Sequence, residues 1–444
     1  RLTRPAGAGR GGAGAAAWPA GSAAAALVRL VVLLAVGAAA CCARVWYTSG
    51  TQIARMDPYS NPVAASEDPW IRRLSYSLVH GMYVRLLLWP TFLCYDYSMD
   101  AVPLVHSLAD VRLLLPCASY LGLAALGTAA VRCLRPLRGL GTRVIAEGPA
   151  VGIVVFLLGF LPMSNIFFPI GTLVAERLLY IPSAGALAAL VSIAHVEASS
   201  GPVRRRGHRI AAVGLVATLG FWWVLCYRRV LEWQSVQSIT LADGLKQPRS
   251  SRTQFNLGNL MLQASRLDEA LAAYMRANGA DPQERDAMPL YHAGQILMYQ
   301  GRYPEAEQFL HKAVTGYFSP LTLAEEEVWH DYGLALWHVG RREEAVQNFQ
   351  NAITTNPAFP KGYNNLGCAL VLLGLSATPA NAQTVQQGLQ AMEQAISLLP
   401  STPLYWRNAA VLLHLGGDGQ PALRAWEQYR QLDPAGAAAA EAAG

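Results

Sequence analysis

The sequence predicts an all-α protein, in which a polytopic transmembrane helical domain is followed by an α-solenoid of repeated helix pairs. The first observation is that 53% of the 444 residues are apolar and mean hydropathy is positive, which is too apolar for a purely soluble repeat protein. The second is that the apolar stretches of near bilayer length all lie in the first half. The third is that, in the second half, large and small residues recur with a period of about 34 residues.

The charges also divide the chain into two unlike halves. Residues 1–240 carry 21 Lys and Arg against 10 Asp and Glu, whereas residues 241–444 carry 14 against 19. The basic excess consists of short arginine clusters between apolar runs, without the interleaved aromatics of a nucleic-acid surface, so we expect no nucleic-acid partner. Such clusters instead indicate how a chain is oriented in a membrane.

Residues 1–60 are predicted to be a low-complexity segment with one candidate transmembrane helix. The chain begins at Arg1 rather than Met and continues in Arg, Gly and Ala, which we interpret as an incomplete gene model that lacks its true N-terminus. The apolar run 25–43 approaches spanning length, although Arg29 interrupts it and a signal peptide has a similar pattern.

Residues 61–230 are predicted to be a polytopic membrane domain. Its apolar runs approach the length of about 20 residues that a bilayer requires; they are 78–95, 113–131, 149–168, 179–197 and 210–227. The arginines within 132–143 and 204–209 place those two loops in the cytoplasm. The segments 96–112 and 169–178 and everything after 227 then face the opposite side, which in a eukaryote is the lumen of the endoplasmic reticulum (ER). Arg228 and Arg229 argue weakly against this orientation.

Residues 250–434 are predicted to be an array of about five tetratricopeptide repeats. The pattern places Leu-Gly in a first helix and Ala, an aromatic residue, Ala and Pro in and after a second helix. Two clear copies read Leu257, Gly258, Met261, Ala270, Tyr274, Ala277, Pro282 and Trp329, Tyr332, Gly333, Leu336, Ala345, Phe349, Ala352, Pro357. A weaker copy lies between them, a fourth carries an insertion at 377–386, and a fifth ends at Pro434. The remainder, 435–444, is expected to be disordered.

Two sets of residues are candidates for function. Glu176 and Arg177 lie at the edge of a predicted span, where ionisable groups are costly and often mark a site, and Asp96 lies in another polar segment. A structural ion pair between spans, or a helix N-cap for Asp96, is the competing interpretation. In the repeats, Asn256, Asn259, Asn364 and Asn365 could hydrogen-bond an extended polypeptide, although most repeat residues serve packing. No metal-ligand spacing, phosphate loop or nucleophile elbow is visible.

The polar segments of the first half, in this order and followed by the repeats, resemble the transmembrane and tetratricopeptide-repeat-containing O-mannosyltransferases of the GT-C type. The resemblance rests on Asn61-Pro62-Val63-Ala64, Leu86-Leu87-Leu88-Trp89-Pro90, Leu93-Cys94-Tyr95-Asp96-Tyr97-Ser98-Met99, Phe160-Leu161-Pro162-Met163-Ser164-Asn165 and Val174-Ala175-Glu176-Arg177-Leu178-Leu179-Tyr180-Ile181-Pro182-Ser183. It covers about 61–434 and describes 61–230 as the C-terminal part of the membrane domain.

The resemblance implies an ER membrane enzyme that transfers mannose from dolichyl phosphate mannose to Ser or Thr of secretory or cell-surface polypeptides, with membrane lipids around it. The family's acidic pair lies near the N-terminus, and nothing before Asn61 supplies it. No catalytic base is therefore assigned within 1–444, and the need for a divalent metal is unknown. Among the residues present, our candidate for binding the donor phosphate is Arg177, with Glu176, Asp96 and Tyr180 as its partners.

A non-catalytic alternative stays open at this point. Without the catalytic carboxylates, the spans could simply anchor a repeat scaffold that recruits client proteins in the ER. A transporter would need two related halves with broken helices, and the sequence shows no such internal symmetry.

Overall fold

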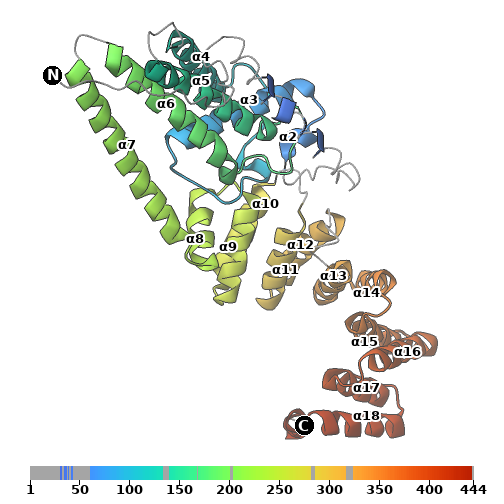
Figure 1. Cartoon of the computed structure of the whole chain (residues 1–444). Coiled ribbons are helices and arrows are strands. Elements are labelled where there is room, and N and C mark those ends of the chain that lie inside the picture. Colours follow the sequence, from blue (N-terminus) through green and yellow to red (C-terminus); the bar gives the residue numbers. More distant parts are fainter. Residues whose placement is uncertain are drawn as a thin grey trace, which may run out of the picture. The chain divides into compact units, whose positions relative to one another are not determined.

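The computed structural model describes residues 61–133, 140–167, 169–200, 204–281, 286–316 and 324–442, together with a few residues between 31 and 43. Within these ranges the chain is helical and contains no β-strand, which confirms the all-α fold class (Figure 1). The N-terminal candidate span 25–43 falls largely outside the described residues. The chain divides into two compact units, 1–57 with 126–169 and 178–197, and 58–125 with 170–177 and 198–444.

The membrane half is built from α2 to α7. Their bounds are Pro62–Ala65 for α2, Pro69–Leu88 for α3, Leu114–Cys133 for α4, Leu140–Phe160 for α5, Tyr180–Ser200 for α6 and Arg204–Glu232 for α7. In the described residues, three helical stretches are long and apolar enough to cross a bilayer, namely Val111–Arg132, Glu176–Ala194 and Ala212–Glu232. A shorter apolar stretch covers Gly148–Met163.

The structure corrects the expected span 78–95. Helix α3 ends at Leu88, because Pro90 disfavours a helical conformation for Trp89, whose φ and ψ are −138° and 78°. The helix begins nine residues earlier than the expected span and carries Arg72, Arg73 and Arg85. One face of it is buried, with Val79 and Tyr83 almost inaccessible to solvent. This segment is therefore a helix packed within the protein, followed by a non-helical stretch.

The first compact unit contains a close crossing of α5 and α6. A Cβ at Gly152 would meet the backbone of α6 at Ala189 and Gly185, and a Cβ at Gly185 would meet the backbone of Phe156. Small residues at such a crossing let two membrane helices approach closely enough for extensive van der Waals contact. Gly152 and Gly185 thus permit the close approach of these two helices.

In the second unit, the short helix α8, Val236–Lys246, joins α7 to the repeats, and a capping box between Ser235 and Ser238 starts it. Five helix pairs follow in the described part: α9 (Ser251–Gln263) with α10 (Leu267–Gly279), α11 (Met288–Tyr299) with α12 (Tyr303–Thr315), α13 (Glu325–Val339) with α14 (Arg342–Thr355), α15 (Pro360–Ser376) with α16 (Ala382–Leu398), and α17 (Pro403–Leu415) with α18 (Gly419–Leu432). They match the five repeat copies that the sequence predicts.

The glycines of the repeat pattern lie where the two helices of a pair approach each other. A Cβ at Gly258 would come within 2.5 Å of the Tyr274 ring, and one at Gly333 within 2.7 Å of the Phe349 ring. The insertion of the fourth repeat lengthens α15 and α16 to 17 residues each. Residues after Pro434, expected to be disordered, instead form α19, Pro434–Ala442, because alanine has the highest helix propensity.

Candidate functional site

The candidate site is the segment 94–99, which follows α3 and ends at the first residue of the 3-10 helix Met99–Ala101, together with the groups that hold it. We call this segment the edge loop. Its residues Cys94, Tyr97 and Met99 are buried, and Met99 has a φ of 53° in the left-handed region, where a non-glycine residue is strained. A strained, buried loop persists only where surrounding contacts fix it, so these contacts define the site.

Glu176 fixes the edge loop from one side. Its Oε1 accepts a hydrogen bond from the Cys94 amide at 2.6 Å and another from the Tyr97 hydroxyl at 2.9 Å. Burial raises the pKa of Tyr97, and the neighbouring Glu176 carboxylate raises it further, so the phenol remains a donor. The Glu176 carboxylate therefore positions the edge loop by accepting these two hydrogen bonds.

A buried ion pair fixes the loop from another side. Asp243 of α8 is inaccessible to solvent; its Oδ1 accepts from Arg229 Nη1 at 2.6 Å, and its Oδ2 from Arg229 Nη2 at 3.1 Å. The same Oδ2 accepts the amide of Tyr95 at 2.8 Å. Arg229 also reaches Glu232 at 2.8 Å, and Lys246 holds Glu232 from α8. Asp243 and Glu232 thus neutralise the Arg229 charge. Arg229 is therefore weak evidence that the C-terminal end of the span 210–227 lies in the cytoplasm.

The first repeat contacts the edge loop directly. Asn256 Nδ2 of α9 donates to the Tyr95 hydroxyl at 2.9 Å, and Arg252 Nε lies 3.7 Å from Asp96 Oδ2. Burial raises the pKa of Tyr95 to about 12, which keeps its hydroxyl neutral. Asp96 also accepts the amide of Ser98 at 2.7 Å. The edge loop therefore joins the membrane half to the repeats.

Two predicted donor-site residues lie apart from these contacts. Arg177 is exposed, and among the described residues no hydrogen bond or ion pair to it is found. Tyr180 is 80% exposed at the start of α6. Glu176 and Asp96 thus both take part in the edge-loop contacts, whereas the side chains of Arg177 and Tyr180 are exposed to solvent. Sequence reasoning missed Arg229 and Asp243, although an arginine at the end of an apolar span is itself a signal for a buried partner.

The predicted asparagines of the repeats divide into two groups. Asn256 belongs to the edge-loop contact, and Asn259 accepts from the Tyr274 hydroxyl at 2.6 Å within its own repeat. Asn364 and Asn365 belong to a hydrogen-bonded row on the first helices of four successive repeats. We call these eight side chains the polar row; they are Tyr291, His292, Gln295, His330, Asp331, Asn364, Asn365 and Asn408.

One group in the repeats has the geometry of a cation site. The ligand atoms of Glu327, His330 and Asp331 lie within 4.8 Å of one another. Each already serves the repeats, because Glu327 pairs with Lys361 at 2.9 Å and Asp331 pairs with His330 at 2.9 Å. Burial acts to raise the pKa of Asp331, but hydrogen bonds from His330, Gln295 and Tyr291 outweigh it and lower that pKa. The group is an internal network.

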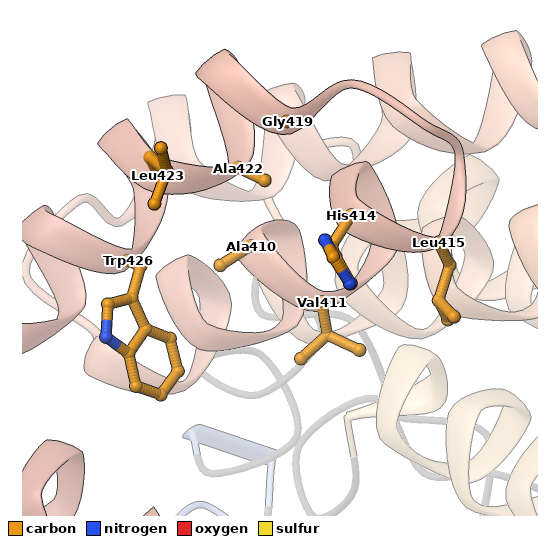
Figure 2. Close-up of a pocket in the computed structure, with 8 residues that line it drawn as sticks. All are labelled: Ala410, Val411, His414, Leu415, Gly419, Ala422, Leu423 and Trp426. Atoms are coloured by element: carbon orange, nitrogen blue, oxygen red, sulfur yellow. The ribbon is translucent and has the colours of Figure 1, made fainter. Parts of the chain in front are cut away.

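An apolar pocket of about 300 Å³ lies in the last repeat, between α17 and α18. Figure 2 shows its lining, in which His414 is the polar group beside apolar side chains such as Val411, Leu423 and Trp426. In a solenoid each helix pair packs against the next pair, and the last pair has no following pair to cover it. An apolar groove is therefore expected at the end of an array. The pocket lies far along the sequence from the edge loop and contains none of the predicted site residues.

Comparisons with known proteins match both parts of the chain. Residues 50–124 match a domain family described as "Protein O-mannosyl-transferase TMTC, DUF1736", and residues 326–359 match a tetratricopeptide repeat. Protein O-mannosyl-transferase Tmtc3 of Drosophila melanogaster is 28% identical over 346 residues, which cover 74% of this chain and 36% of the relative. Protein O-mannosyl-transferase TMTC3 of Homo sapiens is 25% identical over 396 residues, covering 87% and 40%.

The chain spans less than half the length of these two relatives. Among solved structures, YrrB, described as a TPR protein with an unusual peptide-binding site, is 19% identical, with a TM-score of 0.37 over 46% of this chain and 97% of its own. The helices and repeats of this chain define a polytopic membrane protein with a C-terminal tetratricopeptide array. Within that class, the chain is similar to relatives that are named TMTC protein O-mannosyl-transferases.

Proposed function

We propose that this chain contributes the acceptor-holding and lipid-facing part of an ER membrane protein O-mannosyltransferase. The enzyme transfers mannose from dolichyl phosphate mannose to a Ser or Thr hydroxyl of a secretory-pathway polypeptide. The observation that carries the proposal is the edge loop, which lies in the matched TMTC domain and is hydrogen-bonded to the first repeat through Tyr95 and Asn256. A polypeptide on the repeats would thereby be held next to the membrane.

In this reaction the acceptor oxygen attacks the anomeric carbon of the mannose, and the bond to the lipid phosphate breaks. The departing phosphate gains negative charge, which a cation in a site shielded from water stabilises strongly. Arg177 is our candidate, because it is exposed at the start of the candidate span Glu176–Ala194 and its guanidinium can bind a phosphate through two N–H groups. The proton of the acceptor hydroxyl passes to a base that we do not assign within 1–444.

The contacts of Glu176 and Asp96 give them positioning roles in this proposal. Glu176 holds the edge loop through Cys94 and Tyr97, and it directly precedes Arg177 in the same 3-10 helix, Glu176–Leu179. Asp96 lies between the amide of Ser98 and the guanidinium of Arg252. Tyr180, exposed one residue beyond that helix, stays a candidate for contact with the donor lipid.

The test uses the longest natural form of the protein that contains this chain, purified with lipid and given radiolabelled dolichyl phosphate mannose and an acceptor domain. Arg177→Ala should lower transfer about 100-fold, as removal of a single charge-stabilising donor does in other enzymes. Arg73→Ala, which removes an exposed arginine of α3, is the matched control. Equal transfer by wild type and Arg177→Ala would remove Arg177 from the donor site. No transfer by the wild-type protein would favour the scaffold alternative.

The proposed orientation, an ER membrane protein with lumenal repeats, has a separate test. A tag placed after Gly444 should resist protease in sealed microsomes and become sensitive when detergent opens them. Digestion of the tag in sealed vesicles would place the repeats in the cytosol and would contradict the proposed handling of lumenal acceptors.

A further inference from the structure

Helix α8 begins directly beyond the candidate span Ala212–Glu232, separated from α7 by the short connection 233–235 (Figure 1). The span has 21 residues, and a helix of that length extends about 31 Å, close to the thickness of the hydrocarbon core of a bilayer. Glu232 therefore marks the depth at which α7 leaves the hydrocarbon.

Polar contacts hold α8 near that depth along its length. In its first turn, the Ser238 hydroxyl donates to the backbone carbonyl of Glu232 at 2.9 Å. Further along, Asp243 forms the buried pair with Arg229. At its last residue, Lys246 Nζ donates to Glu232 Oε1 at 2.6 Å. Because these contacts all reach the last turn of α7, α8 stays beside the end of the span instead of leading away from it.

The two sides of α8 have the opposite polarity to the sides of a helix on a water-soluble protein. Its inner side holds the solvent-inaccessible Asp243 and also Gly244, whose carbonyl accepts from Gln254 of α9 at 2.6 Å. Its outer side carries Leu241 and Leu245, which lie four residues apart on one face and are 45% and 73% exposed. A surface helix normally turns its leucines inward and its charged residues outward. Large apolar side chains exposed together mark a surface that contacts a membrane or another protein.

The exposed apolar surface of α8 continues that of the span. Trp233 and Val236, which lie between the span and Leu241, are both exposed. Tyr227 is exposed near the end of α7, and tryptophan and tyrosine are enriched where a membrane meets water. The neighbouring Arg228 is also exposed, and an arginine at this depth can extend its charge to the lipid head groups. Continuity with the span therefore favours the bilayer, rather than a second protein, as the partner of this surface.

We propose that α8 is an interfacial membrane helix, whose Leu241 and Leu245 insert between the lipid head groups and the acyl chains on the side of the membrane that the repeats occupy. The inner side of the same helix binds the Tyr95 amide through Asp243 and contacts α9. Insertion of α8 thereby sets how far the edge loop and the first repeat lie from the bilayer. The proposal goes beyond the proposed function, since it requires neither a sugar donor nor an acceptor.

The test attaches a nitroxide to α8 in the longest natural form of the protein that contains this chain, held in phosphatidylcholine nanodiscs. Electron paramagnetic resonance measures collisions of the nitroxide with oxygen, which concentrates in lipid, and with a water-soluble nickel chelate. The label is placed at Leu241→Cys or Leu245→Cys after the accessible native cysteines are replaced by serine. The ratio of oxygen to nickel collisions should be several-fold higher at both positions than at Gln350→Cys, an exposed site on α14. Val216→Cys, an exposed site within the span, sets the value for lipid contact.

The collision rates distinguish three surroundings of the leucines. A high oxygen-to-nickel ratio at both positions supports the proposal. Frequent collisions with the nickel chelate would place the leucines in water, and few collisions with either reagent would show that protein covers them. Each of these two results would overturn the proposal. Mannose transfer is not measured, so a failure of the proposed function leaves the result unchanged.

A second measurement uses hydrogen exchange of the backbone amides of α8 in the same nanodiscs. Leu245→Gln should raise exchange about tenfold, because the burial of one leucine side chain in an apolar medium is lost. Gln237→Ala, at an exposed polar position of the same helix, is the matched control and should exchange as the wild type does. Equal exchange in Leu245→Gln and the wild type would show that lipid does not stabilise α8 through Leu245, and would also overturn the proposal.

Discussion

The repeats and the edge loop are held in place in opposite ways. The repeats rest on many short-range apolar contacts that recur with the sequence period, such as Gly258 against Tyr274 and Gly333 against Phe349. The edge loop rests on a few polar contacts between residues far apart in sequence, with Glu176 following Cys94 by 82 positions and Asp243 following Tyr95 by 148. Losing one contact should therefore affect the two regions very differently.

The difference shows how the two regions suit different tasks. In a solenoid each repeat contacts only its neighbours, so stability is shared among similar interfaces and the surface is free to bind a ligand. The edge loop depends instead on the buried pair Arg229–Asp243, which concentrates stability in two side chains because either charge left alone in the interior is costly. The predictions below test this contrast from the largest expected effect to the smallest.

Removing one partner of the buried pair should have the largest effect. Asp243→Ala leaves the Arg229 guanidinium without its main counter-ion and the Tyr95 amide without an acceptor, and should cost about 3–5 kcal/mol. Hydrogen exchange of the backbone amides of α8 and α9 measures this loss of stability. Lys246→Ala, which breaks a partly exposed pair with Glu232, should cost about 1 kcal/mol or less. Similar losses for the two variants would show that the edge loop does not depend on Asp243.

A crowded repeat glycine should have the next largest effect. Gly333→Ala places a Cβ within 2.7 Å of the Phe349 ring and should destabilise the third repeat by about 1–3 kcal/mol. Gly279→Ala at the end of α10 meets no neighbouring atom and should be neutral or stabilising by up to about 1 kcal/mol. Hydrogen exchange of the two repeats compares them, and a neutral Gly333→Ala would mean that the helix pair is less tightly packed than the structure shows.

The first two repeats should lose stability in mild acid. Burial lowers the pKa of His292, which stacks on Tyr274 at 5.5 Å, so the unfolded chain binds the proton more readily. The neutral His292 side chain therefore makes its full contribution to the free energy of unfolding above about pH 6.5. That contribution falls as the pH drops towards the lowered pKa of His292 in the folded protein, by at most about 1.4 kcal/mol per pH unit. Exchange rates of α9 to α11 at pH 7 and pH 5.5 measure this loss, and His292→Gln should reduce it. An unchanged pH dependence in that variant would assign it to other groups.

Replacing the Glu176 carboxylate by an amide should have the smallest effect. In Glu176→Gln an oxygen still accepts from the Cys94 amide and the Tyr97 hydroxyl, so we expect a loss of about 1 kcal/mol, the difference between charged and neutral hydrogen bonds. Mannose transfer should fall only severalfold, with an unchanged pH profile. Complete loss of transfer in a folded Glu176→Gln protein would instead make Glu176 a proton acceptor in the reaction.

The sequence predicted the repeats well because their information is local. The Gly and aromatic positions of each copy, such as Gly333 and Phe349, contact each other within one helix pair, so a periodic pattern is sufficient. For the residues around the edge loop, the sequence predicted only that polar groups such as Glu176 and Asp96 mark a site, and not which groups contact each other. Nothing in the pattern near Asp243 indicates that Arg229 and Tyr95 would meet on it, since that contact depends on how α7, α8 and the edge loop fold together.

Two further misses have simple physical causes. The span expected at 78–95 was assigned by apolarity alone, and the effect of Pro90 on Trp89 was not weighed. The acceptor-binding role of Asn256 stays a prediction, and in the structure its side chain contacts Tyr95. Asn408, which belongs to the polar row, was not predicted, because its partner Asn364 lies 44 residues away.

The most direct test of the account is a double-mutant cycle on the contact that joins the edge loop to the repeats. Tyr95→Phe removes the hydroxyl and Asn256→Ala removes its donor, and each should lower the hydrogen-exchange protection of α9 by about 1 kcal/mol. The account predicts that the double variant loses little more than either single variant, a coupling of about 1 kcal/mol. Fully additive losses would show that the two side chains do not interact, and that the repeats are not joined to the membrane half in this way.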